Sequence, residues 1–224
     1  MKDYYLDIAR RYSLFLIGLF IASMGVALST KAGLGTSPVA SLPYTVSLMS
    51  GLLTFGGWLN ALSVTQITIQ VILLKGKCKY VEIFLQTVLA FIYGYLTDFS
   101  CFLIRGLTLH NYPAQLACMA ASCFVLAFGI WVQLKGNVAL LPGEAMNRAI
   151  SQVTGKKYTN IKIFFDALYI VLSAILCMIF LGGLKGVREG SIIAAVAVGM
   201  LIKGYEKIYR RIRGRQKQQP ESRK

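Results

Sequence analysis

Six apolar runs of about twenty residues follow one another along the chain, and most charged residues lie in the short segments between them. Each run is long enough to cross a hydrocarbon core of ~30 Å as a helix. Charged residues make up only 15% of the chain, whereas about a quarter is usual in soluble domains. The sequence therefore predicts an all-α polytopic membrane protein with six transmembrane helices. The predicted spans are Tyr12–Ser29, Trp58–Leu74, Glu82–Ile104, Tyr112–Leu134, Asn160–Gly182 and Gly190–Tyr205.

The distribution of basic residues predicts how the chain crosses the membrane. If the N-terminus is cytoplasmic, 20 of the 24 Lys and Arg residues fall on the cytoplasmic side, as the positive-inside rule requires. Both termini are then cytoplasmic, and residues 1–224 form a single membrane domain that ends in a basic tail at 209–224. The net charge of +15 is thereby explained without nucleic acid. The partners expected are the lipid bilayer and, for the tail, anionic headgroups.

The two halves of the chain align when one is shifted by 104 residues. The first three predicted spans then fall on the last three, with repeat 1 at residues 12–104 and repeat 2 at 116–208. Because three is an odd number, the second half would cross the membrane in the opposite direction to the first. Inverted repeats of this kind are common among secondary transporters. Identical residues at matched positions include Gly25 and Gly129, Lys31 and Lys135, Pro38 and Pro142, and Ser47 and Ser151.

Each repeat contains a segment rich in Gly and Pro after its first span, at residues 31–43 and 135–147. In both, a short helix is predicted to begin at the proline, which suits the first helical position. Ser37 is a favourable N-cap for the first of these helices. Neither helix is long enough to span a bilayer, so each segment forms either a re-entrant hairpin or an interfacial helix.

If both hairpins are re-entrant, their helix N-termini converge near the middle of the membrane. Unpaired N–H groups at helix starts bind carboxylate or phosphate, so the sequence predicts a site for a small anionic or zwitterionic solute. Polar side chains on the second and third spans either line the same cavity or form hydrogen bonds between helices. The predicted substrate-binding residues are Gly35, Thr36, Ser37, Pro38, Asn60, Gln66, Gln70, Tyr93, Pro142 and Gly143.

Three acidic residues in or near the membrane are candidates to carry a coupling proton: Asp98, Glu144 and Asp166. Glu144 could instead pair with Arg148, and Asp166 with Lys162, because each pair is spaced i,i+4. Asp98 has no such partner in its own span and is therefore the strongest coupling candidate.

The function expected is that of a secondary transporter. The alternatives are a substrate-binding subunit of a multicomponent uptake system and a non-transporting regulator or scaffold. The sequence leaves the oligomeric state undecided and is compatible with a homo-oligomer. No metal-binding, phosphate-loop or nucleophile–base pattern occurs, so neither a cofactor nor enzymatic activity is expected. The five cysteines have no zinc-like spacing and are interpreted as small apolar residues.

Several short motifs resemble the YczE/YitT-like family of bacterial integral membrane proteins. They are GLGTSPVASLPYTVS at 33–47, PGEAMNRAIS at 142–151, KIFFDALYIVLS at 162–173 and GGLKGVREGSIIAAVAVG at 182–199. The resemblance implies a bacterial plasma-membrane protein of the permease type. GVREGS replaces the family's GIGTGT-like stretch before the last span, which implies a different specificity if that loop contributes to a substrate site.

Overall fold

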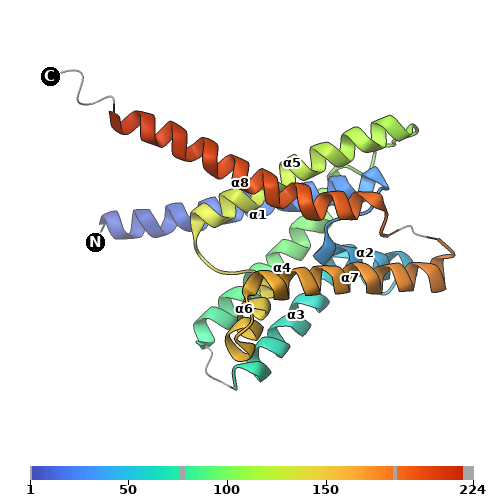
Figure 1. Ribbon diagram of the computed structural model, residues 1–224, viewed down its shortest axis with the longest axis horizontal. Helices are drawn as coiled ribbons and strands as arrows, with labels where there is room; N and C mark the ends of the chain where they lie inside the picture. Colours follow the sequence, from blue (N-terminus) through green and yellow to red (C-terminus); the bar gives the residue numbers. More distant parts are fainter. Residues whose placement is uncertain (1, 76–78, 184–185, 219–224) are drawn as a thin grey trace.

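The computed structural model describes residues 2–75, 79–183 and 186–218, and these residues form helices joined by short connections. Cys78, Lys185 and the last part of the predicted basic tail, residues 219–224, lie outside the described residues. Figure 1 shows the start of α1 and the C-terminal end of α8 on the same side of the molecule. The helices are α1 (Lys2–Ala32), α2 (Pro38–Met49), α3 (Phe55–Leu73), α4 (Tyr80–Leu103), α5 (Tyr112–Gly136), α6 (Pro142–Thr154), α7 (Tyr158–Leu181) and α8 (Glu189–Gln218).

Among the described residues, four helices are long and apolar enough to cross a membrane, and these are typical of a helical membrane protein. They lie at Leu6–Ala32, Tyr80–Leu103, Tyr112–Gly136 and Tyr158–Leu181. The other two predicted spans are also helical, as α3 and α8, but neither is among the four. Amides and hydroxyls lower the hydropathy of α3, and the basic C-terminal part does the same for α8. The prediction of a helical membrane protein thus agrees with the structure, whereas six spans remain a prediction.

The most extensive helix contact joins α1 and α5, which run antiparallel (Figure 1). Glycines bring the two backbones together: a Cβ atom added to Gly129 would lie 2.4 Å from the backbone nitrogen of Ala22, and one on Gly25 would lie 2.6 Å from that of Leu126. Small residues at such a crossing allow close van der Waals packing, which drives helix association in lipid. Gly25 of α1 and Gly129 of α5 therefore allow this close helix contact.

The remaining helices pack around this central pair. Helix α4 packs on α1 and α8 packs on α5, while the short helices α2 and α6 each contact both α3 and α7. Helices α3 and α4 pack against each other, but α7 and α8 diverge toward the end of the molecule where the C-terminus lies (Figure 1).

The two short helices begin where the sequence predicts, with Pro38 and Pro142 at the first helical position. Gly33 and Gly35 adopt φ values of +68° and +101° in the connection before α2, a backbone conformation that other residues rarely adopt. Ser37 is the N-cap residue of α2, as predicted, but its side chain makes no capping hydrogen bond within the described chain. The two glycines thus allow the chain to turn between the end of α1 and the start of α2.

Candidate functional site

A cavity of about 540 Å³ lies between the first turns of α2 and α6 and the facing sides of α4, α5, α7 and α8. The two short helices thus direct their N-termini into one space, although they belong to segments about a hundred residues apart in the chain. Six of the predicted site residues line it: Ser37, Pro38, Tyr93, Gly143, Glu144 and Asp166.

Both helix starts lack a side-chain cap. The N-cap residues are Ser37 and Leu141, and within the described structure neither side chain accepts a hydrogen bond from the first turn. The first N–H groups of an α-helix have no partner within the helix, and the helix dipole adds partial positive charge there. Val39 in α2 and Gly143 in α6 lie in these first turns and line the cavity. The site can therefore bind negatively charged oxygen atoms.

Three buried amide side chains also line the cavity: Gln86 from α4, Gln133 from α5 and Asn147 from α6. Their exposed fractions are 5%, 6% and 5%, respectively. Gln86 Oε1, Gln133 Nε2 and Asn147 Oδ1 each lack a hydrogen-bond partner among the described residues. A buried polar atom without a partner costs about 1–3 kcal/mol, so these side chains favour a polar ligand or water in the cavity.

The predicted site residues did not include these three amides. Each of them has a signal in the sequence. Gln133 interrupts an otherwise apolar run, and Asn147 follows Glu144 by three residues and therefore shares its helix face. Gln86 lies on the same polar face of α4 as Tyr93. Which of the many membrane-embedded amides turns toward the cavity depends on how the helices pack.

The charged residues of the cavity differ in their pairing. Lys162 and Asp166 form the predicted ion pair, with 3.8 Å between Nζ and Oδ2. Glu144 and Arg148, for which pairing was one of two alternatives, both line the cavity but form no ion pair within 4.0 Å in the described structure. The i,i+4 spacing permits such a contact, but side-chain rotamers decide whether it forms.

Asp98 lies outside the cavity and is engaged elsewhere. The Thr54 hydroxyl donates to its Oδ2 at 2.6 Å, and the Gly56 N–H donates to its Oδ1 at 2.7 Å. Its carboxylate thus caps the N-terminus of α3 and ties that end to α4. These partners come from the start of another helix, so spacing within α4 does not reveal them. The tie removes the main argument for Asp98 as the strongest coupling candidate.

The other predicted substrate-binding residues lie outside the cavity lining. The Thr36 N–H donates to Ser191 Oγ at 3.1 Å, and Gln66 Nε2 donates to the hydroxyl of Tyr169, a cavity residue, at 2.9 Å. Asn60 packs against Gly94 between α3 and α4. The predicted residues that do not line the cavity are Gly35, Thr36, Asn60, Gln66, Gln70 and Pro142.

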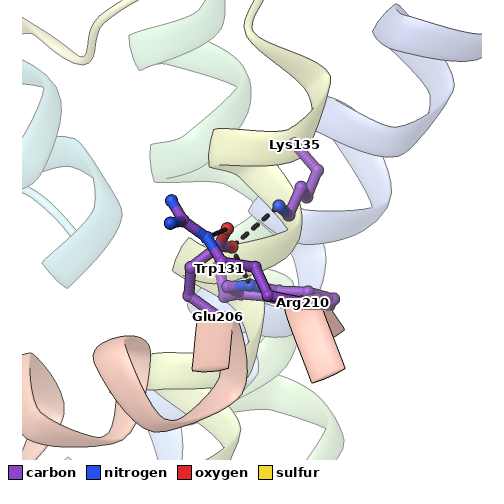
Figure 2. Close-up of polar contacts among 4 residues, drawn as sticks. All are labelled: Trp131, Lys135, Glu206 and Arg210. Atoms are coloured by element: carbon purple, nitrogen blue, oxygen red, sulfur yellow. Dashed lines mark hydrogen bonds and ion pairs between the residues drawn. The ribbon is translucent and has the colours of Figure 1, made fainter. Parts of the chain in front are cut away.

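A charged cluster joins the end of α5 to α8 beside the cavity (Figure 2). Glu206 accepts hydrogen bonds from Lys135 at 2.7 Å, from Arg210 at 2.9 Å and from the Trp131 indole at 3.1 Å. These three donors lower the pKa of Glu206 to about 2. The cluster holds this part of α8 against α5 and away from α7.

Comparisons with known proteins place the chain in a family. A profile described as "Family of unknown function (DUF6198)" matches residues 9–207. The chain belongs to this family. It is also similar to "Uncharacterized protein YyaS" of Bacillus subtilis (strain 168), with 27% identity over 202 residues, which cover 90% of this chain and 94% of that protein. No solved structure matches. The family shown is DUF6198, and the resemblance of the short motifs to the YczE/YitT-like family stays a prediction.

Proposed function

We propose that this DUF6198 member is a secondary transporter for a small anionic or zwitterionic solute, which binds in the cavity between α2 and α6. The observation that carries the proposal is the meeting of two short-helix N-termini in one cavity lined by buried amides without partners. Interrupted helices whose N-termini face a central site are a recurrent plan for binding solutes in transporters.

The packing of the helices supports an inverted repeat. If α1 to α4 are exchanged for α5 to α8, the contacts α1–α4, α2–α7 and α2–α3 become α5–α8, α6–α3 and α6–α7, and all of these contacts occur. Two side-chain contacts are related by the same exchange of the two halves. Lys31 donates to the carbonyl of Arg105 at 2.9 Å, and Lys135 lies 4.2 Å from the ring centre of Tyr209. Both members of the second pair are 104 residues further along the chain.

One contact breaks this symmetry and favours an inward-facing state. Helices α3 and α4 pack together, whereas their counterparts α7 and α8 diverge. We place the protein in a bacterial plasma membrane, as the motif resemblance implies, with cytoplasmic termini, as the positive-inside rule predicts. The divergent ends then face the cytoplasm. The α3–α4 contact, tied by Asp98, then closes the outer side. Alternating access would exchange these two arrangements, with Glu144 and Asp166 as the coupling carboxyls that the cavity contains.

Purified protein in liposomes tests the proposal. Counterflow of radiolabelled amino acids, dicarboxylates and phosphate is measured against empty liposomes and against two variants. Asn147→Leu removes a buried cavity amide and should reduce flux, whereas Asn160→Leu, at an exposed position near the start of α7, should leave it unchanged. Binding without flux would instead favour a subunit of a larger uptake system, and neither binding nor flux would favour a regulator or scaffold.

A further inference from the structure

The cavity has chemistry for both signs of charge. We infer that its solute is an amino-acid-like zwitterion, whose carboxylate binds at the N-terminus of α2 and whose ammonium group binds beside Glu144. This inference rests on the proposed function and specifies the substrate class of the same cavity.

The two helix N-termini differ chemically. The first turn of α6 carries Glu144, whose carboxylate offsets the positive end of that helix dipole. The first turn of α2 reads PVAS and has no acidic residue, and the position that matches Glu144 under the shift of 104 is Ala40. The N-terminus of α2 therefore needs an anion from outside, whereas that of α6 already has one.

Glu144 also differs from Asp166, another acidic residue that lines the cavity. Asp166 is paired with Lys162, but Glu144 has no ion-pair partner within 4.0 Å in the described part of the chain. A carboxylate next to an apolar cavity gains from an opposite charge within hydrogen-bond distance. The ammonium group of a ligand would supply that charge.

The unpartnered amide atoms match the same ligand. Gln133 Nε2 is a donor, which suits a carboxylate, while Gln86 Oε1 and Asn147 Oδ1 are acceptors, which suit an ammonium group. Asn147 follows Glu144 by three residues on the same face of α6, so both can face one cationic group. Apolar walls from Leu126, Ile130 and Val198 leave room for an apolar side chain.

Matched sets of probes test the inference on the full-length protein in detergent. Each set contains an apolar amino acid, the acid without its amino group and the amine without its carboxylate. The sets are built on leucine, methionine, phenylalanine and tryptophan. Isothermal titration should show that at least one amino acid binds at least tenfold more tightly than both of its analogues. The inference is overturned if no amino acid binds, or if an acid without the amino group binds as tightly as its parent.

Two pairs of variants assign the two ends of the ligand. Ser37→Asp places a carboxylate at the start of α2 and should weaken amino-acid binding at least tenfold relative to the neutral Ser37→Asn. Aspartate is itself a favourable N-cap, so loss of binding would not reflect loss of the helix. Glu144→Gln should weaken the amino acid at least tenfold and leave the acid without an amino group unchanged. Equal loss for both ligands would contradict the assignment of Glu144.

The liposome assay separates this inference from the proposed function. Flux of phosphate or dicarboxylates with no amino-acid binding would refute the zwitterion and keep the transporter. Amino-acid binding that depends on Ser37 and Glu144 without any flux would keep the site and refute the transporter.

Discussion

Replacing Gly129 by alanine tests whether the close crossing of α1 and α5 stabilises the molecule. The added Cβ would lie 2.4 Å from the nitrogen and 2.7 Å from the Cα of Ala22, and 2.8 Å from the carbonyl oxygen of Gly18. All three are backbone atoms, so no side-chain rotation can relieve the contact and the helices must separate. Overpacking of this kind costs about 1–3 kcal/mol.

The matched control is Gly204→Ala in α8, where a Cβ would meet no described atom within 4 Å. Both substitutions gain up to about 1 kcal/mol of helix propensity, so this contribution cancels when the two variants are compared. The remaining difference in the free energy of unfolding is about 1–3 kcal/mol, with Gly129→Ala the less stable variant.

Unfolding by sodium dodecyl sulfate in mixed micelles, followed by tryptophan fluorescence, measures this difference. Trp131 lies on α5 and reports on the helix that must move. A midpoint for Gly129→Ala equal to or above that of Gly204→Ala would refute the argument that the α1–α5 crossing depends on backbone contact.

Three further predictions concern charges and orientation. Because the pKa of Glu206 is lowered, its contacts contribute their full stability above about pH 4.5, and this contribution is lost as the pH falls toward about 2. In unfolding measured against pH, the stability difference between the wild type and Glu206→Gln should therefore shrink over that range. Asp98→Asn should destabilise the protein by about 1–3 kcal/mol, because it weakens two hydrogen bonds to a charged acceptor, and an unchanged unfolding midpoint would contradict a tie between α3 and α4. In a cysteine-free background, a cysteine at Lys157 should be labelled only from the cytoplasm and one at Arg105 only from outside; outside labelling at 157 would rule out the inverted repeat.

Local sequence signals predicted the elements of this protein. Long apolar runs predicted helices because, in lipid, the backbone must satisfy its own hydrogen bonds. Pro38 and Pro142 predicted the starts of α2 and α6 because proline lacks the N–H that a helix start leaves unpaired. The shift of 104 residues pointed to the two short helices together, which is how Ser37, Pro38 and Gly143 were found.

Contacts between distant segments decided the rest. Asp98 has no partner in its own helix, but Thr54 and Gly56 at the start of α3 hold its carboxylate. Glu144 and Arg148 have the spacing of a pair and form none, while Gln133 and Asn147 prove to line the cavity. Spacing along one helix determines only which residues share a face; which face turns toward the cavity depends on how all the helices pack, and only the tertiary structure specifies that.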